Sequence, residues 1–193
     1  LVQRLNAALT HWTRQIKEVV NEKDTLEARE NAGPLAEIEF WRTRAADLSG
    51  IREQLGRSDV KQIVDVLFKA KTSKNLDAFQ KLSSLIQRRY TEAQDNLKFL
   101  TILEPSCIKL AEAHPREIPE LLPDILNRIR LIGSFSYSYG TADRLGSLLR
   151  KVSNEIINRC RSAISLEEVF AGDLEGSIMV LNECVTCGKS WKT

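Results

Sequence analysis

Hydrophobic residues recur every three or four positions along most of this chain, the spacing of amphipathic helices. The longest regular stripe begins at Leu76 and continues to Leu100. No segment sustains the strict apolar–polar alternation of a half-buried strand. The pattern predicts an all-α chain of about eight or nine helices. The expected helices cover, in order, residues 1–30, 34–55, 59–73, 76–103, 105–113, 118–135, 141–164, 165–172 and 173–193.

Glycine and proline mark the expected helix boundaries. Gly33 ends one helix, and Pro34 suits the first position of the next, where a missing N–H costs nothing. Pro105 is expected to separate a long helix from a short one, and Ser58 is expected to act as an N-cap. Thr141 is expected to cap the helix over 141–164 in the same way.

Several of these helices are too long for a compact globule of 193 residues. Long amphipathic helices with short connectors form antiparallel bundles. We therefore expect elongated, stacked antiparallel helical bundles. The expected division is a first bundle segment over residues 1–104 and a second over 105–193 that continues beyond the last residue.

The stretch from Gly33 to Arg44 concentrates charged and aromatic residues at the start of a helix. Its apolar stripe, which begins at Ile38 and Trp41, predicts a helix anchored in a core. Glu37 and Glu39 point about 200° apart on a helix, so they cannot form a shared acid–base pair. We expect both carboxylates to be solvated or ion-paired.

Composition excludes several classes of partner. The 28 lysines and arginines nearly balance the 26 aspartates and glutamates, which leaves a formal charge of +2. A near-neutral chain is not expected to bind nucleic acid or an acidic membrane surface. No apolar run reaches the length of a membrane span, and the first residues do not resemble a signal peptide. The four scattered cysteines are expected to be reduced thiols in the cytoplasm.

The motifs with chemical potential are incomplete. Cys184 and Cys187 form a CxxC pair, but a structural zinc site needs four ligands. The pair is expected to pack on a helix face, and any role beyond packing stays open. Gly188-Lys189-Ser190 resembles the end of a phosphate loop, but Glu183 stands where its first glycine belongs. His11 and His114 lack a nucleophile at a recognisable spacing. No catalytic, metal-binding or cofactor-binding residues are therefore expected.

The amphipathic faces remain as the functional signal. Tryptophan is common both in protein interfaces and in protein cores. Trp41 is expected in the core, whereas the first and last tryptophans are equally compatible with core and interface. The candidates for structural or interaction roles are Trp12, Phe40, Trp41, Arg42, Tyr90, Phe99 and Trp191.

Several stretches together resemble a known family. The first of these stretches is His-Trp-Thr-Arg-Gln-Ile at residues 11–16, and the second is Gly-Pro-Leu-Ala-Glu-Ile-Glu-Phe-Trp-Arg at 33–42. Asp-Leu-Ser-Gly-Ile follows at 47–51, Glu-Ala-Gln-Asp-Asn-Leu-Lys-Phe-Leu at 92–100 and Ser-Asn-Glu-Ile-Ile at 153–157. In this order and spacing they resemble the N-terminal tail region of dynein heavy chains, and the opening resembles axonemal members. The connector Ser-Tyr-Gly-Thr at 138–141 has one tyrosine where the family often has two.

The resemblance implies a non-catalytic tail segment of a microtubule motor. Such a tail associates with other dynein heavy chains, binds intermediate and light chains, and attaches to docking proteins on doublet microtubules. It implies a location in the cytoplasm and in the axoneme of a cilium or flagellum. The ATPase ring of such a motor belongs to a different part of the heavy chain, so no enzyme activity is expected here.

Two alternatives have the same helical pattern without the resemblance. One is a stand-alone helical scaffold or adaptor that binds partner helices, which an ATPase ring in the same reading frame would eliminate. The other is a small helical enzyme, for which ATP turnover by the purified chain would be required.

Overall fold

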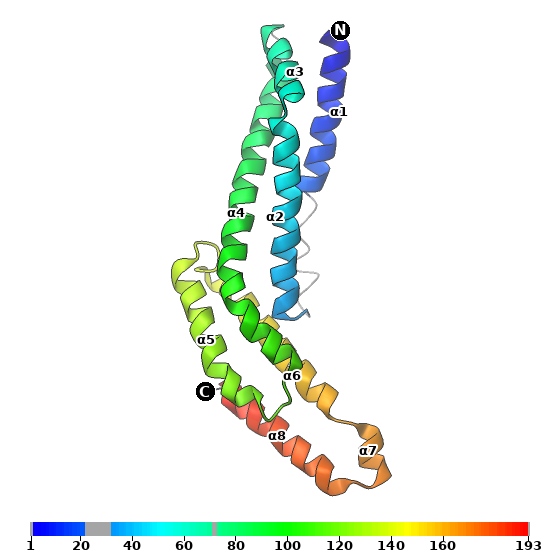
Figure 1. Ribbon diagram of the computed structural model, residues 1–193, viewed down its shortest axis with the longest axis vertical. Helices are drawn as coiled ribbons and strands as arrows, with labels where there is room; N and C mark the ends of the chain where they lie inside the picture. The colour runs from blue at the N-terminus through cyan, green and yellow to red at the C-terminus, as the bar shows by residue number, and fades with distance from the viewer. Residues whose placement is uncertain (1, 22–31, 71–72, 193) are drawn as a thin grey trace. The chain divides into compact units, whose positions relative to one another are not determined.

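The computed structural model describes residues 2–21, 32–70 and 73–192, and every regular element in these ranges is an α-helix. The all-α prediction is confirmed. Figure 1 shows the helices in chain order. They are α1 (Val2–Asn21), α2 (Pro34–Gly56), α3 (Ser58–Lys69), α4 (Ser73–Glu112), α5 (Ile118–Phe135), α6 (Ala142–Ala163), α7 (Leu166–Ala171) and α8 (Leu174–Lys192).

Within the described ranges, seven helices have 12 residues or more, fewer than the eight or nine that were expected. The remaining element, α7, is a short helix of six residues. The main difference is at Pro105, which lies inside the 40-residue helix α4 instead of separating two helices. The predicted continuation of the first helix over residues 22–30 lies outside the described residues.

The helix α4 continues through Pro105, although this proline removes one backbone hydrogen bond of the helix. A proline inside a helix cannot donate to the carbonyl four residues earlier, here that of Thr101. Thr101 and Pro105 are both exposed, so water can reach that carbonyl. The next carbonyl, that of Ile102, accepts a hydrogen bond from Arg128 Nη1 of α5 at 2.6 Å. A side chain that is distant in sequence therefore stabilises the helix beside its proline.

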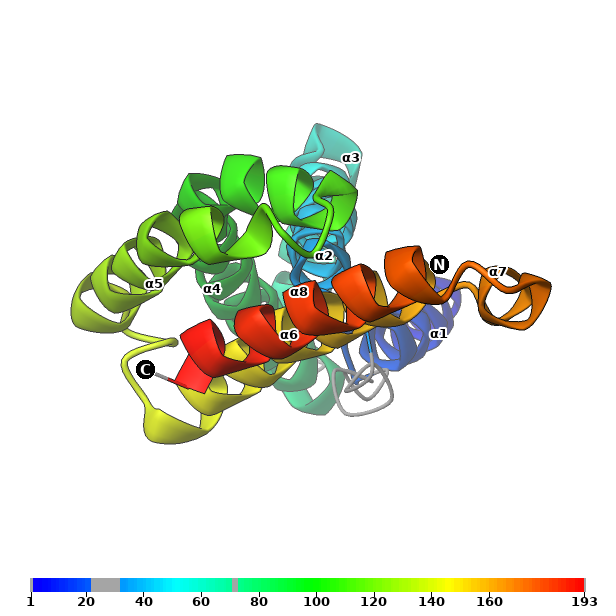
Figure 2. The same cartoon turned by 90° about the horizontal axis from the view of Figure 1, so that it is seen from below.

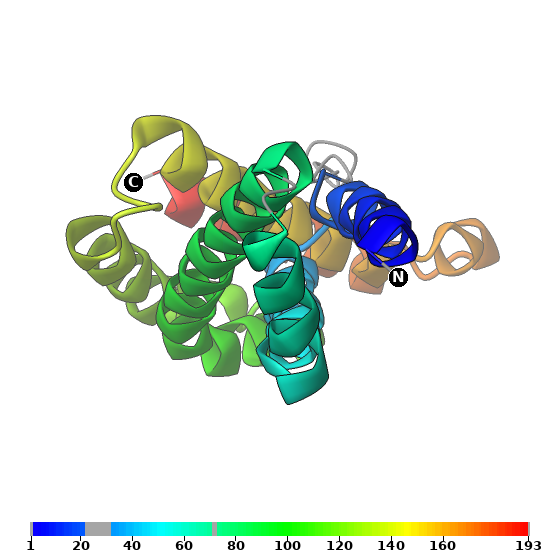
Figure 3. The ribbon, with the colours of Figure 1, turned by 90° about the horizontal axis from the view of Figure 1, so that it is seen from above.

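The chain divides into two compact units. The first contains α1, α2 from Phe40 onward, α3, and α4 up to Asp95. In it α1 contacts α3, and α4 runs antiparallel to α2 and α3 (Figures 1 and 3). A core cluster of Leu9, Val60, Leu67 and Phe79 joins these helices.

Two sequence details of the first unit need correction. Helical spacing in the sequence predicts a stripe on the first helix through Leu1, Leu5, Ala8, Trp12, Ile16 and Val19. In the structure Ala8 is exposed and Leu9 is buried. The buried face is therefore turned by about one residue from the predicted one. Ser58 is the first residue of α3 and Arg57 holds the N-cap position, without a side-chain capping bond. Asp59 Oδ1 accepts from the backbone N–H of Val60 at 2.9 Å instead.

The second unit contains α2 up to Glu39, α4 from Asn96 onward, and α5 to α8. Helical spacing predicts that five residues of the helix over 118–135 face inward, namely Ile118, Leu122, Ile125, Ile129 and Ile132. This stripe is confirmed, because all five side chains are buried. The helix α5 contacts both α6 and α8. Figure 2 shows α6 and α8 side by side, and two hydrogen bonds connect them. Thr141 occupies the N-cap position of α6 but makes no side-chain capping bond.

Asp173 opens α8, as predicted from the sequence. Its Oδ1 accepts from the backbone N–H of Gly176 at 3.0 Å, and its carbonyl accepts from Ser177 Oγ at 2.8 Å. Gly172, which precedes it, has a φ of 97°. Glycine adopts this left-handed conformation without the cost that a Cβ imposes, so the chain can turn between α7 and α8.

Candidate functional site

A buried ionic cluster centres on Glu37 at the start of α2. The side chain of Glu37 is 5% exposed, and Lys151 of α6 is 2% exposed. Lys151 Nζ donates to Glu37 Oε2 at 2.5 Å, and the hydroxyl of the fully buried Tyr139 donates to Glu37 Oε1. Both carboxylate oxygens therefore have charged or polar partners, as a buried carboxylate requires. Glu37 is ion-paired, one of the two environments that the sequence predicted for it.

Local packing places Tyr139 over Glu37. Ser136, at the end of α5, is buried, and its Oγ accepts from the backbone N–H of Tyr139 at 3.2 Å. Its carbonyl accepts from the N–H of Gly140 at 2.8 Å. A Cβ at Gly140 would lie 2.9 Å from that carbonyl oxygen, so this tight turn requires glycine. The turn between α5 and α6 therefore holds the tyrosine in the core.

Lys151 enters the core from a helix that is otherwise apolar on that side. Leu148, Val152 and Ile156 are the other buried residues of α6. A lysine among such positions is rarely buried unless it is paired. Sequence analysis did not identify Lys151 or Tyr139. The available signal was a lysine beside the buried stripe of α6, but its partner, 114 residues away, cannot be inferred from local spacing.

This cluster lacks the features of an acid–base site. A catalytic carboxylate needs access to substrate, whereas all three side chains here are buried. The arrangement is a satisfied ion pair with an additional hydrogen bond, which fixes α2, α6 and the α5–α6 turn in one packing. Its role within the second unit is structural.

The sequence-predicted candidates do not form one site. Trp41 is 3% exposed and buried, as its stripe predicted, and Phe40 packs edge-on against it with ring centroids 5.0 Å apart. Trp12 is half-buried, 6.2 Å from the ring of Phe79. Arg42 is exposed. These residues belong to the first unit.

The other candidates have separate surroundings. Tyr90, in the first unit, lies under the Arg52 guanidinium at 4.1 Å, which is a cation–π distance. In the second unit Phe99 is half-buried, and Trp191 donates from Nε1 to Ser153 Oγ at 2.9 Å. The interaction roles of all seven candidates stay predictions.

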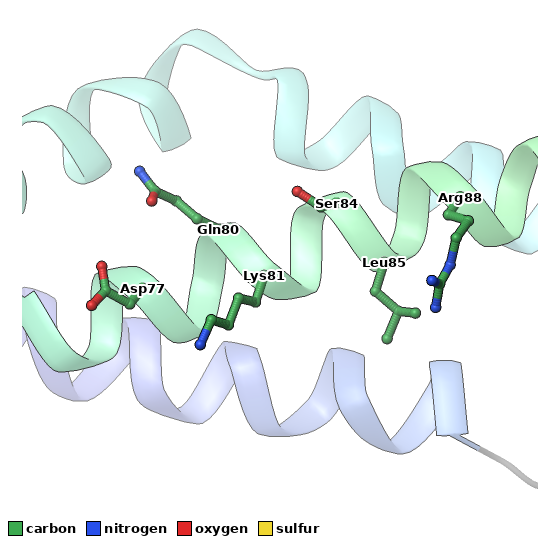
Figure 4. A pocket seen from close by; sticks show the side chains of 6 residues that line it. All are labelled: Asp77, Gln80, Lys81, Ser84, Leu85 and Arg88. Atoms are coloured by element: carbon green, nitrogen blue, oxygen red, sulfur yellow. The ribbon is translucent and has the colours of Figure 1, made fainter.

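A groove of the first unit lies along α4. It has a volume of about 600 Å³, and all the residues that line it belong to α4 (Figure 4). In Figure 4, Lys81 and Leu85 extend toward α1, and Gln80 extends the other way. Ligand sites usually gather polar groups from several elements, so we interpret this groove as an open helix surface. Its lining residues are Asp77, Gln80, Lys81, Ser84, Leu85 and Arg88.

The cysteines are nearer to one another than their positions in the sequence suggest. Cys184 and Cys187 of α8 face α6, where Cys184 Sγ lies 3.8 Å from the carbonyl oxygen of Cys160. Cys107 of α4 is buried, and burial together with the carboxylates of Glu155 and Glu104 raises its pKa to about 12. Among the residues that the structure describes, no group of three or more His, Cys, Asp or Glu side chains is arranged to hold a metal ion.

One face of α8 carries large apolar side chains that the second unit does not cover. Leu174 is 63% exposed, and Ile178, Leu181 and Val185 are about half exposed. Their spacing of four, three and four residues is that of a coiled-coil seam. Phe170 of α7, 85% exposed, lies four positions before Leu174. Large apolar side chains exposed at this spacing are suited to contact with another helix.

In the described part of the chain, no helix has both the length and the apolar content to cross a membrane.

Comparisons with known proteins connect this helical architecture to one family. The family model described as "Dynein heavy chain, N-terminal region 1" matches residues 2–193. The chain is 54% identical over 192 residues to the dynein-1-beta heavy chain of the flagellar inner arm I1 complex of Chlamydomonas reinhardtii. It is 48% identical over 152 residues to dynein axonemal heavy chain 2 of Homo sapiens.

A third relative is the Chlamydomonas dynein-1-alpha heavy chain of the same I1 complex, 32% identical over 192 residues. The alignments cover 100%, 79% and 99% of this chain, respectively, but only 4%, 3% and 4% of the three relatives. The resemblance found in the sequence motifs is confirmed. With a family model matched across almost its whole length, this chain belongs to the dynein heavy chain family and represents its N-terminal region 1.

Proposed function

We propose that this chain is a non-catalytic assembly segment in the tail of an axonemal dynein heavy chain. The proposed location in the axoneme of a cilium or flagellum rests on its relatives, which are axonemal or flagellar heavy chains. The aligned segment is 4% of the Chlamydomonas dynein-1-beta heavy chain, so that heavy chain is about 25 times longer than the segment. The activity of a whole motor belongs to a protein of that length. The segment contributes binding surfaces to such a motor.

The observation that carries the proposal is the apolar seam of α8. We define the α8 seam as Leu174, Ile178, Leu181 and Val185, all of them exposed. Another side of α8 packs within the chain: Cys187 is buried there, and Trp191 donates a hydrogen bond to Ser153 of α6. A helix with a second apolar stripe at heptad spacing is suited to receive another amphipathic helix. We propose that its occupant is a helix of a partner dynein chain.

The partners in this proposal are a second dynein heavy chain and the dynein intermediate and light chains. Attachment to docking proteins on doublet microtubules is part of the same assembly role. We also propose that the helices form elongated, stacked antiparallel bundles, with bundle segments over residues 1–104 and 105–193. Long helices such as α4 are compatible with that arrangement.

Binding of purified partners tests the proposal. The full chain is mixed separately with a purified dynein intermediate chain and with the N-terminal region of a second heavy chain, and each Kd is measured. The variant replaces Leu174 and Ile178 by serine. Burying the lost side chains is worth about 1.5–3 kcal/mol each, so the Kd of the relevant partner should rise at least tenfold.

A matched control replaces Phe68 by serine. Phe68 is 66% exposed on α3, in the first unit, so the control removes similar apolar surface from a different place. The control should bind like the unmodified chain, and both variants should keep its melting temperature. The proposed docking surface is wrong if neither partner binds, or if the double variant and the control have the same affinity.

A further inference from the structure

The helices α6 and α8 run side by side (Figure 2). At their contact, Cys160 of α6 lies near the CxxC pair Cys184 and Cys187 of α8. Cys184 Sγ lies 3.8 Å from the backbone carbonyl oxygen of Cys160, 24 residues earlier. The thiols of Cys184 and Cys187 are also near enough to the Cys160 thiol to shift its pKa. All of them are free thiols in the structure. One cysteine of α6 thus faces two cysteines of α8.

Their accessibility differs. Cys160 and Cys184 are half-buried, whereas Cys187 is completely buried. An oxidant from solvent therefore reaches the first two before the third. The hydrogen bond between Trp191 Nε1 and Ser153 Oγ, 2.9 Å long, connects the same two helices nearby. Together with the contact between Cys184 Sγ and the Cys160 carbonyl, this bond shows that α6 and α8 pack against each other through their side chains here.

We propose that Cys160 and Cys184 form a reversible disulfide that joins α6 to α8 covalently under oxidising conditions. The inference is independent of the assembly role proposed above, because it concerns a bond within one chain. Nothing in the CxxC spacing predicts it, since the reacting pair is Cys160 with one member of that motif.

The chemistry balances with hydrogen peroxide as the oxidant. The thiolate of Cys160 attacks one peroxide oxygen, the O–O bond breaks, and the leaving hydroxide takes a proton to become water. The product is a sulfenic acid on Cys160. The thiolate of Cys184 then attacks the sulfenic sulfur, the S–O bond breaks, and a second water leaves as the S–S bond forms. Two thiols are oxidised and one peroxide is reduced to two waters, and a dithiol reductant reverses the reaction by exchange.

The surroundings make this reaction slow at neutral pH. Burial raises the pKa of the Cys160 thiol, and burial together with the Cys160 thiol raises the pKa of Cys184 to about 11. The charged group beside them is Glu183 of α8, and its carboxylate also raises the pKa of Cys184. His114, from the turn before α5, lies 3.4 Å from that carboxylate. Because only thiolates react, the bond is expected to form under sustained oxidation and faster at higher pH.

The disulfide would stabilise the second unit. It would close a loop that contains α7 and joins residues 24 apart in sequence. A crosslink of this span restricts the unfolded chain enough to raise the melting temperature by about 7–14 °C in a protein of this size. The increase should disappear when a reductant is added.

The test oxidises the full folded chain with hydrogen peroxide at a mildly alkaline pH, digests it without reduction, and identifies the linked peptides by mass spectrometry. The expected product links Cys160 to Cys184 with loss of two hydrogens. Replacing Cys184 by serine should abolish both the link and the rise in melting temperature. Replacing Cys187 or Cys107 by serine should leave both unchanged.

Oxidation of the urea-unfolded chain is the control for proximity, because the length of the closed loop, and not the packing of α6 on α8, then decides which thiols pair. If Cys184→Ser does not fold, the Cys160→Ser and Cys184→Ala variants remove one of the two reacting thiols in its place. The proposal is overturned if the folded chain gives no link between α6 and α8, or if Cys160 pairs with Cys187. It is also overturned if the folded and unfolded chains give the same mixture of links.

Discussion

Replacing Lys151 by methionine should destabilise the second unit strongly. Lys151 is 2% exposed and provides the cation that neutralises Glu37, which is itself 5% exposed. Methionine retains much of the length of the lysine side chain but carries no charge. The Glu37 carboxylate would then stay buried with only the Tyr139 hydroxyl as a partner. An uncompensated buried charge is the expected cause of the loss.

The magnitude follows from the burial of both groups. Removing one partner of a buried ion pair costs about 3–5 kcal/mol, because the remaining charge keeps its desolvation cost without its partner. For a domain of 150–250 residues, each kcal/mol lowers the melting temperature by about 2–4 °C. The Lys151→Met variant should therefore melt about 6–20 °C below the unmodified chain.

A double-mutant cycle separates charge from packing. Glu37→Gln should also destabilise, since it leaves the Lys151 ammonium buried without a counterion. The double variant, with both charges removed, should be more stable than either single variant because no unpaired charge is left. Urea unfolding followed by circular dichroism provides the four free energies of unfolding.

An exposed ion pair is the matched control. Arg57 donates to Asp59 through two hydrogen bonds of 2.9 and 3.1 Å, but both side chains are more than half exposed. Replacing Arg57 by methionine should change stability very little, since water already solvates these charges. Our reasoning is refuted if Lys151→Met is as mild as this control. It is also refuted if the double variant loses the full sum of the two single losses.

Three further predictions concern other parts of the fold. Trp41→Ala should lower the free energy of unfolding, measured in urea, by about 3–5 kcal/mol, because Trp41 is 3% exposed. If the variant kept its stability but lost binding of a partner chain, Trp41 would instead be an interface residue. Gly140→Ala should lower the free energy of unfolding by about 1–3 kcal/mol, because the added Cβ would lie 2.9 Å from a backbone oxygen. The control Gly146→Ala should not destabilise the chain, because no atom lies within 4 Å of the added Cβ. Hydrogen bonds from Arg128 and Ser106 lower the pKa of Asp124 below its usual 3.8, so Asp124 stabilises the fold above that pH and loses this effect as the pH falls. The melting temperatures of the Asp124→Asn variant and the unmodified chain should accordingly differ at pH 6 and converge toward pH 2, and a constant difference would contradict this.

The sequence predicted which stretches are helical with good accuracy because the signal is local. The apolar stripe from Ile118 to Ile132 predicted both the bounds and the buried face of α5. The motif stretches likewise predicted the family. Proline misled the prediction at Pro105, because a local rule marks a break there. In the folded chain Arg128 bonds the carbonyl of Ile102 beside the proline, and the helix continues.

The side-chain clusters of the second unit could not be predicted from the spacing of neighbouring residues. Glu37 was correctly expected to be solvated or paired, but Lys151 is 114 positions away and nothing in either stretch identifies the other. The cysteines were interpreted as scattered for the same reason.

From the sequence by itself, the helical class, most helix bounds and the membership of the dynein heavy chain family were determined, because periodicity and motifs are properties of neighbouring residues. Only the tertiary structure decided that Glu37 pairs with Lys151, that Cys160 faces Cys184, and that the α8 seam is uncovered. Each of these depends on which helix faces pack together. That choice is made by the burial of apolar surface over the whole unit, which no local pattern records.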